Sequence, residues 1–192
     1  IYHAITPLLQ AGDHIISCSS IFGASHTLFT KYYPRFNIQC DYCSAAHPNE
    51  LLNLIKPESR IIYLETPTNP AIEIIDLEWV GKIAKAHNLI LVVDNCFATP
   101  YLQQPIKYGA DLVIHSATKN FDCQGRVLGG VVVGRKDLIR EIYLFARITG
   151  PSLSPFNAWI LSKSIETLSL RMDWHCANAL QLATDLEHHP SI

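Results

Sequence analysis

The chain has 192 residues, a formal net charge of −2, 48% hydrophobic residues and 17% charged residues. This composition predicts a sizeable buried core and excludes intrinsic disorder. The small net charge gives no electrostatic basis for binding nucleic acid or an acidic membrane surface, and no apolar run approaches the roughly 20 residues of a membrane span. We therefore expect no nucleic-acid partner and no membrane partner.

Short β-branched runs alternate with helical patterns along the first two thirds of the chain. The runs predict strands at residues 14–18, 38–42, 60–64, 89–93, 112–114 and 130–133. Helical periodicity predicts helices over 49–55, 77–87 (with Asp76 as N-cap) and 136–148. This alternation favours an α/β fold with three layers, in which helices cover both faces of a mostly parallel sheet.

The last part of the chain has a different pattern. Residues 156–188 contain no Gly or Pro and keep helical periodicity, which predicts a single helix of about 50 Å at roughly 1.5 Å per residue. A helix of that length usually links domains. We therefore expect a domain over residues 1–150 and a linking helix in 151–192 that leads to a further domain. Because the chain begins at Ile1 in mid-pattern, we interpret it as an internal piece of a longer protein.

Six cysteines stand at irregular spacing in a chain that is not small, which favours free thiols and a cytoplasmic protein. Cys40 and Cys43 form a C-x-x-C pair, which leaves open a redox site or a zinc site completed by His26 or His47. A redox motif should open a helix directly after a strand, and here other residues intervene. We expect no metal site in this chain.

Unusual polar residues follow three of the predicted strands. Asn69 lies in "ETPTNP", Asp94 opens "DNCFATP" and Lys119 lies in "HSATKN", each 25 residues from the next. Because ligands gather at the carboxyl ends of parallel strands, these residues are expected at one common edge of the sheet.

A lysine at such an edge has a chemical use. A desolvated lysine can lose its proton and attack an aldehyde, forming a Schiff base. Pyridoxal phosphate requires that amine and also an acid for its pyridinium nitrogen, so that the ring acts as an electron sink. The hydroxyls of Ser116 and Thr118, beside Lys119, suit a phosphate group.

With "VVDN" and "ETPTNP" upstream, "DLVIHSATK" resembles the Cys/Met-metabolism family of pyridoxal-phosphate enzymes over essentially the whole chain. "QGRVLGG" and "ITGPSLSPFNAWIL" look most like its O-succinylhomoserine sulfhydrylase branch. The resemblance implies the fold-type I, aspartate aminotransferase-like large domain. It also implies a homo-oligomer, a dimer or tetramer, whose subunits share active sites.

By this resemblance Lys119 is the Schiff-base lysine and the acid/base at the substrate Cα and Cβ. Asp94 pairs with the pyridine nitrogen, Ser116 and Thr118 contact the phosphate, and Asn69 lies near the phenolic oxygen. Phe22 matches the position that stacks on the ring, where many relatives carry tyrosine. The implied reaction is γ-replacement on O-succinylhomoserine by sulfide, giving homocysteine for methionine biosynthesis. Cystathionine γ-synthase or methionine γ-lyase chemistry is the alternative.

Two positions near the lysine depart from the family pattern. Asn120 stands where an aromatic or aliphatic residue is usual, and Cys123 stands where glycine is usual. If position 123 has a positive φ, the cysteine carries strain of about 1 kcal/mol. These departures leave open a non-catalytic paralogue that keeps the fold and the cofactor only. By the same resemblance, the substrate-carboxylate arginine and the phosphate-binding turn lie outside this chain.

Overall fold

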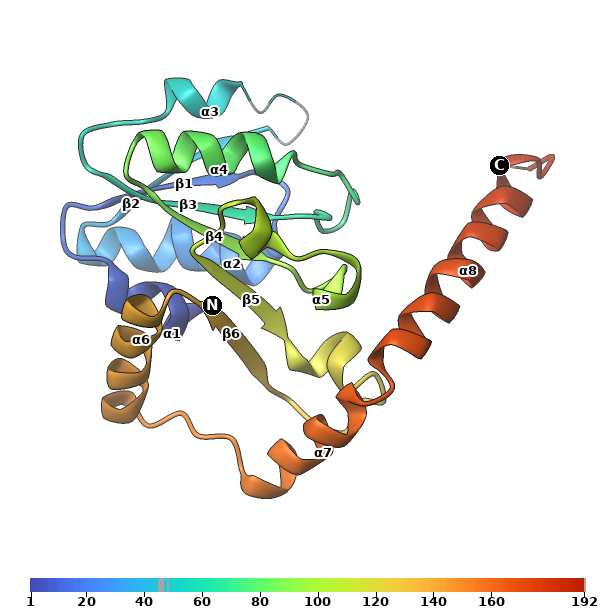
Figure 1. Ribbon diagram of the computed structural model, residues 1–192. Helices are drawn as coiled ribbons and strands as arrows, with labels where there is room; N and C mark the ends of the chain where they lie inside the picture. The colour runs from blue at the N-terminus through green and yellow to red at the C-terminus, as the bar shows by residue number, and fades with distance from the viewer. Residues whose placement is uncertain (45–46, 48, 192) are drawn as a thin grey trace.

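A six-stranded sheet forms the centre of the computed structural model, which describes residues 1–44, 47 and 49–191 (Figure 1). Its strand order is β2-β1-β3-β4-β5-β6. The first five are parallel, and β6 runs antiparallel to β5. The strands are β1 (His14–Cys18), β2 (Gln39–Cys43), β3 (Ser59–Glu65), β4 (Ile90–Asp94), β5 (Leu112–Ser116) and β6 (Gly130–Gly134). The predicted strands and mostly parallel sheet are confirmed, with ends that differ by one or two residues.

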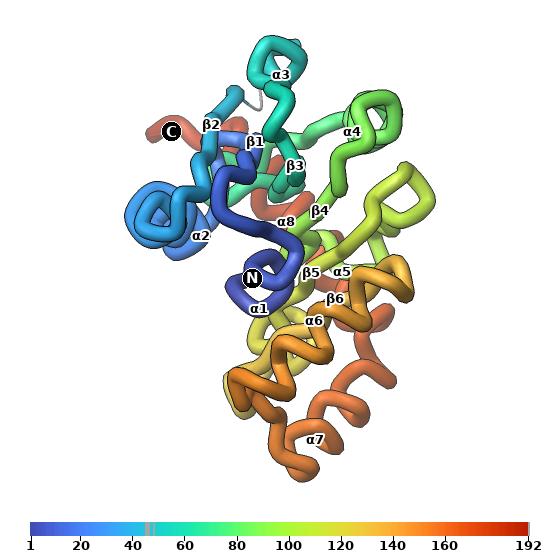
Figure 2. Tube along the Cα trace, turned by 90° about the vertical axis from the view of Figure 1, so that its left-hand side faces the viewer, coloured from blue at the N-terminus to red at the C-terminus, as the bar shows by residue number. Residues whose placement is uncertain are grey.

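Helices cover both faces of this sheet, as Figure 2 shows along the strand order. Helices α3 and α4 lie on one face, and α1, α2 and α6 lie on the other. The α-helices are α1 (Tyr2–Ile5), α2 (Gly23–Thr27), α3 (Glu50–Asn53), α4 (Leu77–Ala86), α5 (Thr99–Leu102), α6 (Lys136–Thr149), α7 (Pro155–Ile165) and α8 (Leu168–Glu187). Single-turn 3₁₀ or π segments are η1 (Thr6–Leu8), η2 (Leu28–Tyr32), η3 (Tyr33–Phe36), η4 (Pro105–Tyr108) and η5 (Ala117–Phe121).

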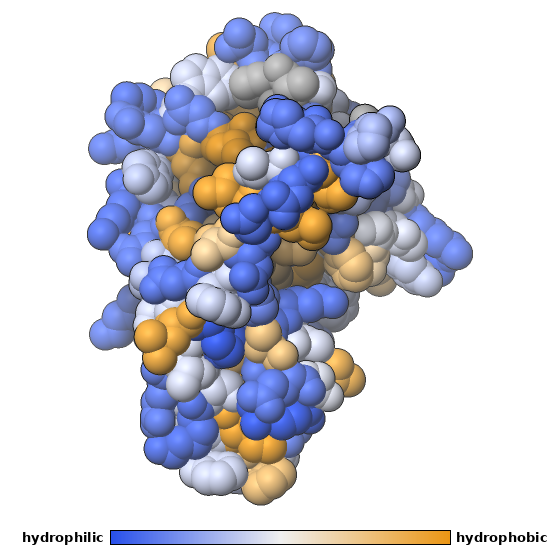
Figure 3. Space-filling model, turned by 90° about the vertical axis from the view of Figure 1, so that its right-hand side faces the viewer, coloured by the Kyte–Doolittle hydropathy of each residue, from blue (hydrophilic) through white to orange (hydrophobic). Residues whose placement is uncertain are grey.

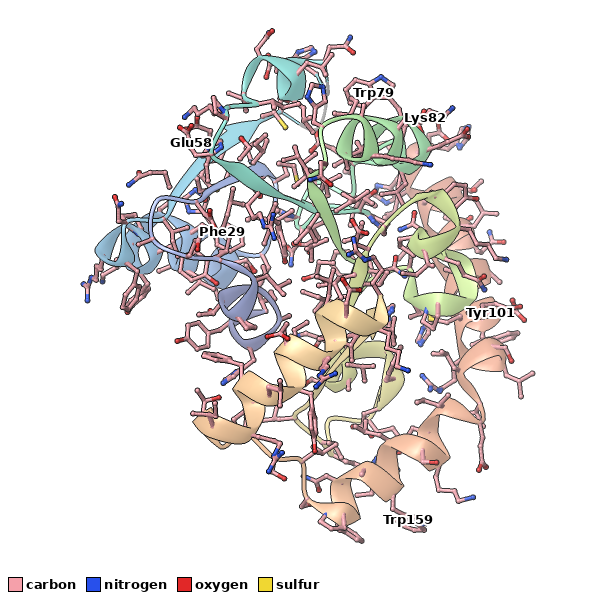
Figure 4. The ribbon with its side chains drawn as sticks, turned by 60° about the vertical axis from the view of Figure 1, so that its left-hand side comes forward. Phe29, Glu58, Trp79, Lys82, Tyr101 and Trp159 are labelled. Atoms are coloured by element: carbon pink, nitrogen blue, oxygen red, sulfur yellow. The ribbon has the colours of Figure 1, made fainter. Side chains whose placement is uncertain are left out.

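Helix α4 shows how the sequence pattern becomes packing. The Asp76 carboxylate accepts the backbone N–H of Trp79 at 3.0 Å, so the predicted N-cap is confirmed. Val80, Ile83 and Ala84 are buried against the sheet, while Lys82 points away from it (Figure 4). Helical patterning therefore places one apolar face on the core, as expected. For helix α3, predicted over 49–55, the structure gives Glu50–Asn53, and the preceding Pro48 lies outside the described residues.

The prediction of one continuous helix over 156–188 is wrong. The chain turns at Glu166 and Thr167 between α7 and α8. The Ser164 carbonyl, which a continuous helix would pair with Leu168, instead accepts the backbone N–H and the hydroxyl of Thr167 and the Arg171 guanidinium. These bonds satisfy the end of α7 locally and allow α8 to leave in a new direction.

Helix α8 extends away from the sheet (Figure 1). The face of the molecule on this side carries apolar patches among hydrophilic residues (Figure 3), and several apolar side chains of α8 are exposed. The most exposed ones are Leu170, Trp174, Leu180 and Leu182. None of the helices in the described residues is both long and apolar enough to cross a membrane.

A buried histidine at the amino edge of the sheet makes stability depend on pH. The His14 Nδ1 lies 2.8 Å from the Ser59 hydroxyl, and its Nε2 lies 3.4 Å from the Asp41 carboxylate. Burial is the main cause that lowers the His14 pKa, and the nearby Lys56 adds to it, although Asp41 acts in the opposite direction. Folding therefore favours the neutral imidazole at this site.

Stability is expected to fall as pH drops below the ordinary histidine pKa of 6.5, because the unfolded chain takes up a proton there first. The loss continues down to the lowered folded pKa, at no more than about 1.4 kcal/mol per pH unit for this group. Urea unfolding of wild type and His14→Gln at pH 7.5 and 5.5 checks this. The variant should be less stable at pH 7.5 but should lose less on acidification. Equal losses in both proteins would contradict the assignment.

Candidate active site

A cavity of about 540 Å³ opens at the carboxyl edge of the sheet, where β3, β4 and β5 end. Every predicted site residue lines it: Phe22, Asn69, Asp94, Ser116, Thr118 and Lys119. Since β3, β4 and β5 run parallel, their last residues reach the same edge and bring separate segments together. The structure thus gathers the residues that the sequence placed at one edge; their individual roles stay predictions.

Asp94 is the last residue of β4 and is only 4% exposed. One carboxylate oxygen accepts the Tyr63 hydroxyl at 3.0 Å, and the other accepts the Cys96 N–H at 3.3 Å. Burial and the neighbouring Asp94 charge raise the pKa of Tyr63, which therefore stays a neutral donor. Among the described side chains no lysine, arginine or histidine forms an ion pair with Asp94. A buried carboxylate that lacks a cationic partner suits a ligand that brings a positive charge.

The Tyr63 ring packs against a helical segment on the same face of the sheet. The Phe29 ring meets the Tyr63 ring edge-on, with centroids 5.1 Å apart, and both side chains are fully buried. Phe29 projects from the helical segment η2 toward the sheet (Figure 4). This aromatic contact fixes the ring whose hydroxyl orients the Asp94 carboxylate.

Lys119 lies in η5, directly after β5, and its backbone leaves the helical region with φ −82° and ψ −122°. The side chain is exposed in this chain, so the desolvation expected from the sequence is not supplied by the described residues. The turn is nevertheless well anchored. The Cys123 N–H donates to the Lys119 carbonyl at 2.7 Å, and the Asp122 N–H donates to the Ala117 carbonyl at 3.0 Å.

Asn120 links the lysine segment to the loop that follows Asp94. Its side-chain amide donates to the carbonyls of Cys96 at 3.4 Å and Phe97 at 3.1 Å. Its own carbonyl accepts the Arg171 guanidinium, which also donates to the Phe121 carbonyl at 3.1 Å. This residue therefore adds a connection between two parts of the site.

The two hydroxyl residues differ in their surroundings. Ser116 Oγ makes no hydrogen bond among the described residues, so it is available to a ligand. Thr118 Oγ1 accepts the Gly129 N–H at 3.0 Å and donates to the Gly129 carbonyl at 3.3 Å. A phosphate contact at Thr118 requires its proton to turn from Gly129 to the ligand.

Two buried titratable residues of the cavity escaped the analysis of the sequence. Glu65 ends β3 beside Asp94, and its carboxylate accepts the Phe22 N–H at 2.6 Å. Burial, followed by the Asp94 charge, raises the pKa of Glu65 to about 7. His115 stacks on Phe121 with ring centroids 5.1 Å apart, and its buried Nδ1 has no hydrogen-bond partner in the described part of the chain. Only the first letter of "ETPTNP" could have pointed to Glu65.

Arginines of the described chain do not reach this cavity. Arg126 pairs with the buried Asp122 at 2.9 Å and donates to the Ser164 hydroxyl, while Arg171 binds backbone carbonyls. Arg147 lies over the Tyr143 ring. Each of the three has a structural partner, so none is a candidate for gripping a substrate carboxylate.

The C-x-x-C pair lies within strand β2 and not at the start of a helix. Residues three apart on a strand point to opposite faces. Burial raises the pKa of Cys40 to about 12, and it also raises that of Cys43. The described residues hold no group of three or more possible metal ligands. Neither the redox nor the zinc interpretation finds the geometry that it requires.

Cys123 has the positive φ that its position in the sequence suggested, at 61°. Its Sγ lies 3.5 Å from the exposed His175 Nε2, a weak contact. Replacing Cys123 by glycine is expected to stabilise the fold by about 1 kcal/mol, because glycine adopts this backbone conformation without strain. Thermal unfolding of Cys123→Gly against Cys123→Ala measures the difference. Cys123→Ala keeps the Cβ and removes the thiol, so equal stabilities of the two variants would contradict the strain.

The residues present fit pyridoxal phosphate. The cavity offers an amine at Lys119, a carboxylate without a cationic partner at Asp94, a free hydroxyl at Ser116 and an aromatic ring at Phe22. This is the donor set that the cofactor's aldehyde, ring nitrogen, phosphate and ring face require. The fold and the residues of this cavity therefore fit the pyridoxal-phosphate domain of fold type I.

The chain belongs to the Cys/Met metabolism PLP-dependent enzyme family, whose model matches residues 1–192. It is 47% identical over 188 residues to O-succinylhomoserine sulfhydrylase of Pseudomonas aeruginosa, covering 98% of this chain and 47% of that protein. It is 38% identical over 192 residues to L-methionine gamma-lyase of Porphyromonas gingivalis, covering 98% of this chain and 48% of that protein.

A solved structure shares the fold closely. The crystal structure of cystathionine gamma-lyase from Lactobacillus plantarum, complexed with L-serine, superposes with a TM-score of 0.93 at 36% identity. The match covers 97% of this chain and 50% of that one. The chain thus spans about half the length of the relatives it matches. These relatives are pyridoxal-phosphate enzymes of sulfur amino-acid metabolism, so the predicted family, fold class and cofactor are confirmed.

Proposed function

We propose that the full-length protein catalyses γ-replacement on O-succinylhomoserine with sulfide, giving homocysteine. The observation that carries the proposal is the 47% identity to O-succinylhomoserine sulfhydrylase over 98% of this chain. Lyase relatives fall between 37% and 41% identity. The gathering of Lys119 and Asp94 in one cavity supplies the chemistry that such a reaction needs.

Pyridoxal phosphate, when bound, supplies an electron sink that stabilises negative charge at the substrate Cα. The Asp94 carboxyl group, buried at the floor of the cavity, would pair with the ring nitrogen of the cofactor. Lys119 binds the cofactor through its amine and, once released, moves protons at Cα and Cβ of the substrate. The Cγ–O bond to succinate then breaks, and sulfide forms the Cγ–S bond.

Phe22 makes Lys119 the main proton carrier in this part of the site. A tyrosine at position 22 would add a hydroxyl that assists proton transfer, whereas phenylalanine can only stack. Asn69, which lines the same cavity, contributes an amide near the phenolic oxygen of the cofactor. Ser116 and Thr118 bind the phosphate as neutral donors. Each of these assignments is part of the proposal.

The organisation of the whole protein belongs to the same proposal. Residues 1–150 form the main part of the cofactor domain, and 151–192 lead to a second domain. The exposed apolar side chains of α8 then pack against that domain or another subunit. The active protein is a cytoplasmic homo-oligomer with shared sites.

The purified full-length protein with pyridoxal phosphate tests the reaction. O-succinylhomoserine and sulfide should give homocysteine and succinate, with little 2-oxo acid released from methionine or from O-succinylhomoserine alone. Cystathionine from O-succinylhomoserine and cysteine would favour a cystathionine synthase instead. Ammonia and 2-oxo acid from methionine would favour a γ-lyase, which the relatives at 37–38% identity represent. Bound cofactor without turnover of any substrate would favour a non-catalytic paralogue.

A further inference from the structure

Glu65 is a second buried carboxyl group in the cavity, without a role in the reaction described above. It is 4% exposed and lines the cavity together with Asp94. The two residues pair in register at the ends of β3 and β4, so both side chains leave the same face of the sheet. Burying a carboxyl group beside another one is costly, so this position calls for an explanation.

Glu65 makes a hydrogen bond to the main chain of Phe22. Its Oε2 accepts the Phe22 N–H at 2.6 Å, and in the described chain this is the only hydrogen bond of that amide. Phe22 is the N-cap of α2, and no side chain caps this helix. Phe22 as a residue is 49% exposed, so packing within the described residues does not fix its side chain. Glu65 therefore anchors the N–H side of Phe22, while the Phe22 carbonyl accepts the backbone N–H groups of Ser25 and His26.

The raised pKa of Glu65 is compatible with its hydrogen bond to the Phe22 N–H. Burial and the Asp94 charge raise the pKa of Glu65 to about 7, so the group is a mixture of neutral and charged forms near neutrality. A neutral carboxyl group still accepts a hydrogen bond through its carbonyl oxygen. The contact with Phe22 thus survives in either form of Glu65.

We propose that Glu65 is a positioning residue for the cofactor, acting through the main chain of Phe22 to keep its ring on the cavity wall. The inference rests on the proposed function, because it assigns the cavity to pyridoxal phosphate with Phe22 as the stacking group. In this inference Glu65 acts through Phe22 and not through a contact of its own with the cofactor. A glutamine at this position keeps an acceptor oxygen and should replace Glu65, whereas leucine fills the space but accepts no hydrogen bond.

Pyridoxal-phosphate affinity and the visible circular dichroism of the bound cofactor test this in the full-length protein. We expect Glu65→Leu and Glu65→Ala to weaken cofactor binding about 10-fold, as loss of a hydrogen bond at a charged or buried group does. Both should also change the visible dichroism, which reports the orientation of the ring. Glu65→Gln should stay within about 2-fold of wild type in affinity. Far-UV dichroism and thermal unfolding without cofactor identify any variant that fails to fold.

A second background separates positioning from a direct contact. The Phe22→Ala protein has no ring left to position. In it, Glu65→Leu should lower the affinity for pyridoxal phosphate by less than about 2-fold further, since effects that act through one group are not additive. An equal loss in both backgrounds, or a failure of Glu65→Gln to restore the dichroism, would overturn the inference. If wild type itself binds no pyridoxal phosphate, the proposed function fails before this inference is reached.

Discussion

Replacing Lys119 by alanine in the full-length protein is expected to lower turnover by roughly 10³-fold or more, because covalent capture of the cofactor and proton transfer are both lost. The anchors of the turn that carries Lys119 are backbone groups, so they do not depend on this side chain. The variant should therefore fold like wild type. Steady-state rates with O-succinylhomoserine and sulfide measure the effect.

Lys136→Ala is the matched control. Lys136 is exposed at the start of α6 and forms no ion pair among the described residues, so its loss should leave the rate unchanged. A Lys119→Ala protein that retains more than about a tenth of the wild-type rate would be inconsistent with proton transfer by this lysine. Added small amines offer a further check, since they can restore part of the proton transfer but not the covalent attachment.

Asp94→Asn is expected to have the second largest effect. The substitution keeps the size of the side chain and an acceptor for the Tyr63 hydroxyl, but it removes the negative charge from the cavity. Charged hydrogen bonds contribute about 1.5–3 kcal/mol, so cofactor affinity should fall by roughly 10- to 100-fold. Turnover should fall by about 10²-fold or more, because the protonated ring nitrogen that stabilises charge at Cα loses its partner.

Asp94→Glu separates charge from geometry. It restores the carboxylate but lengthens a buried side chain beside Tyr63 and Glu65, so it should recover affinity only in part. Cofactor titration and rates of the two variants, side by side, give the comparison. An Asp94→Asn protein with wild-type affinity and rate would contradict a role of the Asp94 carboxylate in cofactor binding and turnover.

The carboxyl edge of the sheet was predictable because it depends on local patterns. Apolar runs followed by Asn69, Asp94 and Lys119 fix strand ends, and parallel strands place those ends together. The role of Glu65 was not predictable in this way. It depends on the strand register that places Glu65 beside Asp94 and on the packing that brings the Phe22 N–H to Glu65. A single sequence shows neither.

Tertiary contacts also account for the local error at the end of α7 and for the contacts of Asn120. The sequence between α7 and α8 contains no glycine or proline. The turn there is stabilised by Arg171, in the first part of α8, which donates to the Ser164 carbonyl. The Asn120 amide bonds to Cys96 and Phe97, 24 and 23 residues away. Such contacts override local propensity and become visible only when the chain is folded.

The site of covalent attachment tests the central claim most directly. The full-length protein, loaded with pyridoxal phosphate, is reduced with borohydride and digested, and the labelled peptide is identified by mass spectrometry. The account predicts one pyridoxyl group, on Lys119 within "SATKN", and none in the Lys119→Ala protein. A label on another lysine, or a folded wild-type protein that takes up no label, would contradict the assignment of this cavity as the cofactor site.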